Sequence, residues 1–186
     1  QKAIDSARKS ISLKEDSAKP WVIIGHAFTA LGNFSEANSA YTKASEIAPD
    51  DASVWVNLGN NFYAQSMYEE AIDSFKKAVS INPSQEGTWF NLGLAYRVKE
   101  QYDEALEAFK NAIDQEPSNP ECWFQKGRIH MTLNQFEEAA ESFGKTVEFS
   151  PTSHDAWYKR GLAFAKCSNH PQAIESFTKV AELWTT

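Results

Sequence analysis

Three amide side chains recur in one register of the sequence, because Asn57, Asn91 and Gln125 follow one another at intervals of 34 residues. An amide offers one hydrogen-bond acceptor and two donors, so it can pair with the backbone of a peptide whatever the sequence of that peptide. The chemistry that this spacing favours is therefore recognition of an extended chain. Ile23 and Lys159 hold the same register position at the two ends of the run and interrupt it.

A second regular set of side chains is basic. Arg97, Arg128 and Lys159 lie 31 residues apart, three short of the interval between the amides. If each interval is a helical repeat, a step of three residues keeps the cations on one face. They would then form a diagonal stripe that favours a partner with acidic side chains or a free carboxylate. The alternative, which the sequence leaves equally open, is that these cations pair with acids on neighbouring helices.

The histidines and cysteines form no catalytic or metal-binding constellation. Cys122 and Cys167 lie 45 residues apart, and the chain contains no CxxC, no HExxH and no ligand pair at i and i+4. We interpret both cysteines as small apolar fillers. The glycines are isolated, so no phosphate-binding loop is predicted. We therefore expect no catalytic residue, no metal and no cofactor, and a protein that is not an enzyme.

The composition limits the class of protein further. The 186 residues include 18 Lys and Arg against 25 Asp and Glu, which gives a net charge of −7. Nucleic-acid binding needs clustered positive charge, so it ranks last among the functions considered. No apolar run approaches the roughly 18 residues of a membrane-spanning helix. We expect a soluble cytoplasmic protein without membrane insertion.

The elements that position these side chains are repeats of 34 residues. Five tryptophans share the interval, namely Trp21, Trp55, Trp89, Trp123 and Trp157. A glycine follows each tryptophan by four residues and permits close approach of a neighbouring helix. Apolar residues recur at i, i+3, i+4 and i+7 within residues 55–62, which predicts one helix, and residues 71–81 predict a second that ends before Pro83. Each repeat is thus predicted to be two antiparallel helices, which must stack to bury their apolar faces.

The pattern W-x2-L-G-x2-Y/F…A-x3-F-x2-A…P resembles the tetratricopeptide repeat, and residues 55–62 and 89–96 are its best copies. The resemblance covers essentially the whole chain and implies an all-α, right-handed α-solenoid of about 11 helices in one domain. The predicted parts are an orphan second helix at 1–17 and repeats at 18–51, 52–85, 86–119, 120–153 and 154–186. Lys126 and Arg160 replace the leucine of the pattern, and His130 replaces its aromatic residue. There we expect local loosening, with the basic stems on apolar surface and the charges in water.

In a tetratricopeptide-like stack, the first helices line a concave groove. By this resemblance the candidate peptide-binding residues are Asn57, Asn60, Tyr63, Phe90, Asn91, Leu94, Arg97, Phe124, Gln125, Arg128, Tyr158 and Lys159. The amides are similar to the asparagine ladder of O-GlcNAc transferase and peroxisomal-import-receptor repeats, which hold extended peptides; the alternative is that Asn is simply common at this position. The chaperone carboxylate-clamp type is not matched, because its cations are absent and Glu121 and Asp155 would repel a carboxylate.

The sequence thus predicts a protein–protein interaction scaffold that binds an extended or helical peptide segment of another protein, acidic if the basic stripe is used. One alternative is a regulatory or substrate-presenting arm of a larger enzyme, and another is a self-assembling module. The chain begins inside a repeat without an initiating Met and ends without a further polar helix. Because terminal repeats need a polar outer face, we expect either a piece of a longer protein or a homo-oligomer that pairs through exposed end repeats.

Overall fold

The computed structural model describes residues 17–85 and 87–185, and this part of the chain contains ten α-helices and no β-strand. The predicted all-α class is confirmed, and the number of helices is close to the expected 11. The orphan helix predicted at 1–17 lies outside the described residues, apart from Ser17. The helices are α2 (Ala18–Ala30), α3 (Phe34–Ile47), α4 (Ala52–Ala64), α5 (Tyr68–Ile81), α6 (Thr88–Val98), α7 (Tyr102–Gln115), α8 (Pro120–Thr132), α9 (Phe136–Phe149), α10 (His154–Lys166) and α11 (His170–Leu183).

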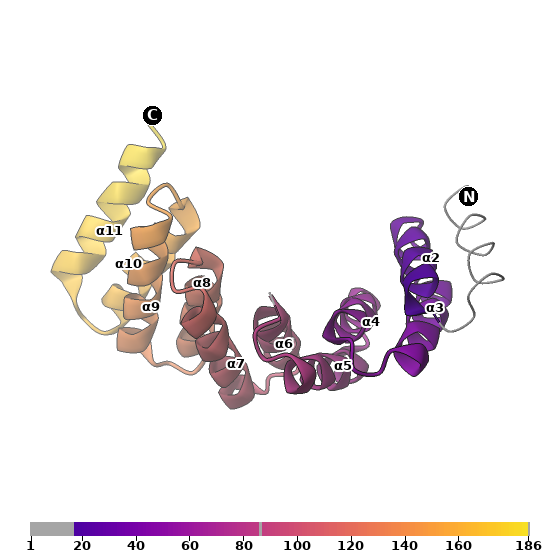
Figure 1. Ribbon diagram of the computed structural model, residues 1–186. Coiled ribbons are helices and arrows are strands. Elements are labelled where there is room, and N and C mark those ends of the chain that lie inside the picture. The colour runs from indigo at the N-terminus through magenta and orange to yellow at the C-terminus, as the bar shows by residue number, and fades with distance from the viewer. Residues whose placement is uncertain (1–16, 86, 186) are drawn as a thin grey trace. The chain divides into compact units, whose positions relative to one another are not determined.

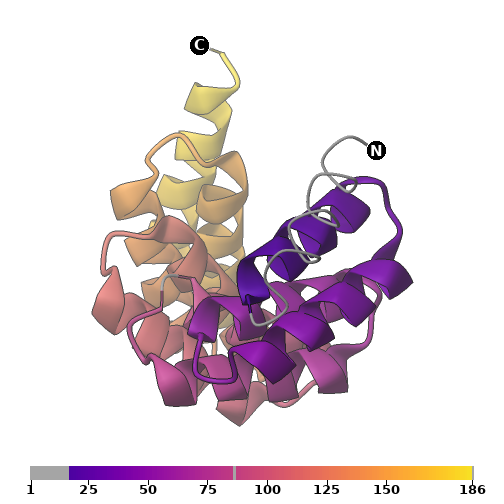
Figure 2. The same cartoon turned by 45° about the vertical axis from the view of Figure 1, so that its right-hand side comes forward.

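The described chain forms two compact units, which lie within Gln1–Gln101 and Tyr102–Thr186. In the N-terminal unit, α2–α3 and α4–α5 are antiparallel hairpins, and α6 packs against α5 (Figures 1 and 2). In the C-terminal unit, α7 packs against α8, and α8–α9 and α10–α11 are hairpins. Within each unit the hairpins stack in chain order, as in an α-solenoid. The boundary between the units falls inside the third predicted repeat, and the repeat boundaries stay predictions.

The turn that follows each first helix contains one residue in the left-handed conformation. Gly32 has a φ of 75°, and its counterparts in the later turns have φ values from 57° to 62°. These counterparts are Ser66, Glu100, Asn134 and Ser168. Glycine adopts this conformation without the steric cost that other residues incur. One backbone geometry is therefore kept through all the described turns of this kind, although only the first has the residue that suits it best.

Four of the five repeated tryptophans make a hydrogen bond that the sequence pattern does not predict. Nε1 of Trp55 donates to the carbonyl oxygen of Pro49 at 2.9 Å, and Nε1 of Trp157 donates to that of Pro151 at 2.8 Å. Trp89 with Pro83 and Trp123 with Pro117 repeat the arrangement. Each tryptophan thereby ties its helix to the turn before it. This bond gives a physical reason for the shared period of tryptophan and proline.

The predicted role of the repeated glycines is confirmed. A Cβ atom at Gly59 would lie 2.6 Å from Cε1 of Phe75, and one at Gly127 would lie 2.8 Å from Cε1 of Phe143. Both phenylalanines are fully buried. Because interiors are close-packed, the second helix of a hairpin can place its aromatic ring here only when the first helix carries no side chain at this point.

The environment of the Arg160 side chain differs from the predicted one, in which the charge lies in water. Its guanidinium lies 5.2 Å from the ring centroid of Trp157 and 5.1 Å from that of Phe164, and its Nε is buried. A Cβ at Gly144 of α9 would lie 3.8 Å from Nε of Arg160, an ordinary van der Waals distance, so α9 packs beside this side chain. The cation is therefore held by two aromatic faces, and this part of the fifth predicted repeat is packed.

Candidate functional site

The candidate residues divide between the two units. In the N-terminal unit, α4 carries Asn57, Asn60 and Tyr63, and α6 carries Phe90, Asn91, Leu94 and Arg97. In the C-terminal unit, α8 carries Phe124, Gln125 and Arg128, and α10 carries Tyr158 and Lys159. The predicted run of amides and the predicted basic stripe therefore each have members in both units.

The amides of the N-terminal unit come together on α4 and α6. Nδ2 of Asn91 donates to Oδ1 of Asn60 at 2.9 Å, which links the two first helices. Asn57 is half-buried, and its side chain makes no hydrogen bond to any other described residue. Its two donors and its acceptor are thus available beside an amide pair that is already fixed in place.

Tyr63 and Arg97 are also brought together in this unit. The ring of Tyr63 meets that of Tyr68 edge to face, with centroids 5.3 Å apart and planes at 71°. Burial raises the pKa of the Tyr63 phenol, the neighbouring phenol of Tyr68 raises it further, and the positive charge of Arg97 opposes both. The guanidinium of Arg97 on α6 is therefore close enough to Tyr63 on α4 to act on it electrostatically.

Gln125 in the C-terminal unit has a different environment from Asn57. Only 7% of its surface is exposed. Its Nε2 donates to Oε1 of Glu121 at 2.6 Å, and its Oε1 accepts from Nη1 of Arg128 at 3.4 Å. Because both ends of this amide already have partners, Gln125 holds Arg128 and Glu121 on one helix face rather than presenting an unpaired amide.

The remaining candidates of the C-terminal unit differ in how accessible their side chains are to a ligand. Tyr158 is exposed, and Phe124 is half-buried against the edge of Phe143, with ring centroids 5.5 Å apart. Nζ of Lys159 lies 3.5 Å from Oδ1 of Asp155. That acid is on the same helix, whereas the alternative drawn from the sequence placed the acids on neighbouring second helices.

Two carboxylates lie beside these candidates, and reasoning from the sequence missed their contacts with Gln125 and Lys159. Glu121 and Asp155 line a cleft of about 230 Å³ with Phe124 and Ser153. Each acid precedes a candidate residue by four positions, Glu121 before Gln125 and Asp155 before Lys159. Residues at i and i+4 are neighbours on a helix, so this spacing could have revealed the contacts.

Asn61 is a further polar residue that the sequence reasoning missed, and it is almost completely buried. Its Nδ2 donates to the carbonyl oxygen of Phe34 at 2.9 Å and to Oδ1 of Asn38 at 2.6 Å, and its Oδ1 accepts from Oγ1 of Thr29 at 3.1 Å. The signal was present, because the same register position in every other repeat is alanine or isoleucine. These bonds join α2, α3 and α4 and belong to the core rather than to a binding surface.

Among residues 17–85 and 87–185, no group of three or more His, Cys, Asp or Glu side chains is placed to hold a metal ion. None of the helices described there is long and apolar enough to cross a membrane. Cys122 is buried, and its burial, with smaller effects from Glu116 and Glu121, raises the pKa of the thiol to about 11. This agrees with its interpretation as an apolar filler, since the thiol stays protonated at neutral pH.

Sequence-family models match most of the chain. A model described as TPR repeat matches residues 25–66 and 59–98, and two models described as tetratricopeptide repeat match residues 88–119 and 124–185. A search of curated proteins found no match.

Solved structures resemble the fold. A crystal structure of MamA is 23% identical, with a TM-score of 0.85 over 89% of this chain and 91% of that one. MamA from Desulfovibrio magneticus RS-1 is 21% identical, with a TM-score of 0.82 over 90% and 95%. YrrB, described as a TPR protein with an unusual peptide-binding site, is 25% identical, with a TM-score of 0.85 over 97% and 93%.

Proposed function

Since the chain belongs to the tetratricopeptide repeat family, we propose that it acts as a protein–protein interaction scaffold that binds an extended peptide of another protein along α4 and α6. The observation that carries the proposal is the arrangement of amides in the N-terminal unit. Asn57 has no side-chain partner among the described residues, and the Asn60–Asn91 pair beside it is fixed at 2.9 Å. The proposal assigns no catalytic step to the described residues.

Recognition would be directed at the peptide backbone. The amide of Asn57 can donate to a peptide carbonyl and accept from a peptide N–H, which gives affinity that does not depend on the side chains of the ligand. Phe90 and Leu94 are half-buried on α6 and offer apolar contacts for alternate side chains of the peptide. The description of YrrB supports a peptide as the ligand class, and for this chain the ligand is part of the proposal.

The C-terminal unit offers a separate contact for acidic residues of a partner, at Arg128. This side chain is exposed and has a single long hydrogen bond, to Gln125 at 3.4 Å. Lys159 contributes less, because Asp155 lies 3.5 Å from its ammonium group. We therefore place the acidic preference at one guanidinium of the C-terminal unit rather than along the whole basic stripe that the sequence predicts.

The test begins with peptides selected by the full chain from a random display library, with affinity measured by fluorescence anisotropy. The Asn57→Ala, Asn91→Ala variant is expected to bind the selected peptides at least about tenfold more weakly, since each lost hydrogen bond is worth about 1 kcal/mol. Asn111→Ala is the matched control, because this amide on α7 bonds only to the carbonyl of Glu107 on its own helix. Unchanged affinity of the double variant would overturn the proposal.

Two further measurements separate the parts of the proposal. A peptide with one N-methylated backbone amide is expected to lose affinity, whereas exchange of the neighbouring side chain is not. Arg128→Gln is expected to weaken acidic peptides alone, while Lys166→Gln, another exposed cation of the C-terminal unit, leaves them unchanged. If Arg128→Gln and Lys166→Gln behave alike, the acidic preference is not located at Arg128.

Self-association is a second candidate function, favoured by the apolar surface of α11. Ile174 is 66% exposed and Trp184 is 78% exposed, whereas Ile72 and Ala140, which share the register of Ile174, are buried. Exposed apolar side chains mark an interaction site where they form one contiguous patch. Light scattering over a concentration series, with Ile174→Glu for comparison, tests this candidate. A strictly monomeric profile of the unmodified chain would exclude it.

A further inference from the structure

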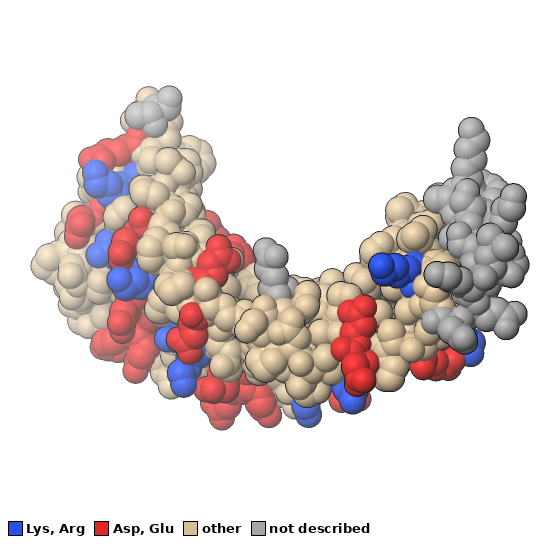
Figure 3. Space-filling model, in the orientation of Figure 1, with Lys and Arg blue, Asp and Glu red and all other residues tan. Residues whose placement is uncertain are grey.

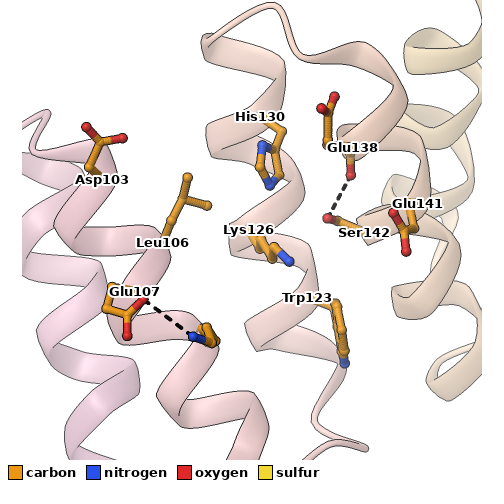
Figure 4. Close-up of a pocket in the computed structure, with 10 residues that line it drawn as sticks. Asp103, Leu106, Glu107, Trp123, Lys126, His130, Glu138, Glu141 and Ser142 are labelled. Atoms are coloured by element: carbon orange, nitrogen blue, oxygen red, sulfur yellow. Dashed lines mark hydrogen bonds and ion pairs between the residues drawn. The ribbon is translucent and has the colours of Figure 1, made fainter.

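A cavity of about 340 Å³ lies in the C-terminal unit, with walls from α7 and α9 and a floor from α8 (Figure 4). It forms where α8 departs from the repeat pattern. Lys126 stands at the position that Ile24, Leu58 and Leu92 hold in the first three repeats, where the side chain is at most 5% exposed. His130 stands where the other repeats have phenylalanine or tyrosine. Two polar side chains thus line a space that apolar side chains fill elsewhere.

The floor of the cavity presents an aromatic face that already attracts a cation. Nζ of Lys126 lies 5.4 Å from the ring centroid of Trp123. Nε1 of Trp123 is used by the bond to Pro117, so the indole ring is fixed in place. Lys126 forms no ion pair with any described residue. A cation above this ring is therefore stabilised by the ring rather than by a carboxylate.

The walls of the cavity are predominantly acidic. Asp103 of α7 and Glu138 and Glu141 of α9 line it, and none of the three forms an ion pair with a described residue. The fourth acid, Glu107, lies 3.8 Å from Lys110. Figure 3 shows acidic side chains, with basic ones among them, on the face of the C-terminal unit that it presents. Lys110 also lines the cavity, so the lining has four carboxylates and two ammonium groups. With Glu107 and Lys110 paired, three carboxylates remain against the single ammonium group of Lys126.

His130 adds a ring nitrogen without a described partner at the side of the cavity. It is 8% exposed, and its Nδ1 lies 2.7 Å from Oε1 of Gln135. Since an amide oxygen only accepts, Nδ1 is the donor of this hydrogen bond. Nε2 has no partner among the described residues. The ring is thus fixed by Gln135, and its second nitrogen remains unpaired beside the acids.

We propose that this cavity receives the guanidinium group of an arginine from a partner protein. Carboxylates and an aromatic face both favour a planar cation with many donors, and Nε2 of His130 adds a polar atom without a described partner beside them. An anionic group would meet three carboxylates, and a metal ion has no suitable cluster of ligands among the described residues. This site lies on different helices from the amides of α4 and α6, so it does not depend on peptide binding there.

The first test uses two small probes with the full chain at low salt. N-acetyl-arginine methylamide is titrated while the indole N–H signals are followed by NMR, with the Trp123 signal assigned from Trp123→Phe. N-acetyl-citrulline methylamide has the same shape without the charge and is the matched probe. We expect arginine to shift the Trp123 signal saturably and to bind at least about fivefold more tightly than citrulline, as expected for paired charges near a surface. Equal binding of the two probes, or no saturable shift with arginine, would overturn the proposal.

A pair of variants at Lys126 separates the cavity from its charge. Lys126→Ala and Lys126→Leu both remove the ammonium group, but alanine enlarges the space, whereas leucine restores the apolar filling of the first three repeats. We expect arginine to bind about threefold more tightly to Lys126→Ala, because a like charge is lost. Lys126→Leu is expected to abolish the shift. Equal affinities of the two variants would show that the probe binds outside the cavity.

The acidic walls are tested against acids on the same helix. Glu138→Gln, Glu141→Gln is expected to weaken arginine binding by about five- to tenfold, since two charge contacts are lost. Glu137→Gln, Glu148→Gln removes the same charge from α9 at residues that do not line the cavity. Circular dichroism checks that both variants are folded. If the two double variants weaken binding equally, only the general charge of the surface attracts the probe, and the proposal is wrong.

Discussion

Two helix junctions at the same register of the repeat are built from different chemistry. In the N-terminal unit, α4 packs against α2 and α3 through polar side chains, namely Thr29, Asn38 and Asn61. In the C-terminal unit, α10 packs against α8 and α9, and the corresponding side chains are Met131, Ala140 and Ala163. We name these the polar junction and the apolar junction. The backbone arrangement of a hairpin and its successor is therefore compatible with either kind of core.

The two junctions resist disruption in different ways. Asn61 uses both ends of its amide within the polar junction, so its stabilising effect depends on the direction and length of three hydrogen bonds. Ala140, Phe143 and Ala163 are buried in the apolar junction, with Met131 packed against them. Contacts of that kind are not directional. The polar junction should therefore specify one alignment of its helices, whereas the apolar junction should tolerate small shifts but no unpaired polar group.

The largest effect is expected when the apolar junction receives the polar residue alone. Ala163→Asn places an amide in a fully buried site without partners and also adds volume. An unpaired buried amide costs about 1–3 kcal/mol, and overpacking adds about 1–3 kcal/mol, so we expect the free energy of unfolding to fall by about 3–5 kcal/mol. Urea denaturation followed by circular dichroism measures the change.

Partners for the new amide should reverse part of this loss. The triple variant Met131→Thr, Ala140→Asn, Ala163→Asn places the three residue types of the polar junction at the corresponding positions of the apolar junction. We expect it to be more stable than Ala163→Asn alone. If the triple variant is less stable than the single one, the two junctions are not interchangeable, and the difference between them extends beyond these three positions.

The converse change in the polar junction is expected to cost somewhat less. Asn61→Ala leaves the carbonyl of Phe34 and the side chains of Asn38 and Thr29 without their shared partner. We expect a loss of about 2 kcal/mol in the free energy of unfolding, because the orphaned groups are largely excluded from water. Asn111→Ala, which changes an amide at the surface of α7, serves as the control. Equal unfolding free energies of the two variants would mean that water replaces the network.

The turns of the two regions provide a smaller contrast. Gly32 and Asn134 occupy the same register position, with φ values of 75° and 57°. No atom lies within 4 Å of a Cβ built at Gly32, so Gly32→Ala has a conformational cost only, which we expect to be about 1 kcal/mol. Asn134→Gly is expected to change stability by less than about 0.5 kcal/mol, because asparagine tolerates this conformation. Thermal unfolding compares the two variants. If Gly32→Ala leaves stability unchanged, alanine is not strained at the positive φ of this turn.

The repeating part of the fold could be predicted from the sequence because the same physical constraint recurs in every repeat. Gly59 must lack a side chain for Phe75 to fit, and Pro83 must end α5, so both constraints are visible as a period. The bond from Trp89 to Pro83 has the same period, but spacing alone does not show which atoms of two residues meet.

The candidate site is less periodic and was harder to predict. Asn57 and Gln125 share a register position, yet one amide has no described partner and the other is held by Glu121. The difference comes from the residue four positions earlier, which is Ser53 in one case and Glu121 in the other. A register predicts which way a side chain points, but its partners depend on neighbours that vary between repeats.

The last contrast concerns Cys122, which is buried on α8. Burial raises the pKa of this thiol from 9.0 to about 11, with smaller effects from Glu116 and Glu121. The folded protein thus binds the proton more tightly than the unfolded chain does. The stability that follows from this difference is fully present below pH 9 and is lost as the pH rises towards 11.

The free energy of unfolding of the unmodified chain, compared with that of Cys122→Ala between pH 7 and pH 11, isolates this contribution. We expect the difference in unfolding free energy between the two proteins to stay constant up to about pH 8. Above pH 9, the unfolding free energy of the unmodified chain should fall steadily relative to that of the variant, because only the unmodified chain must keep a proton on a buried thiol. Cys167→Ala is the control, because that thiol is only half-buried. Curves that stay parallel to pH 11 would mean that water reaches the Cys122 thiol, and that this part of α8 is looser than its burial indicates.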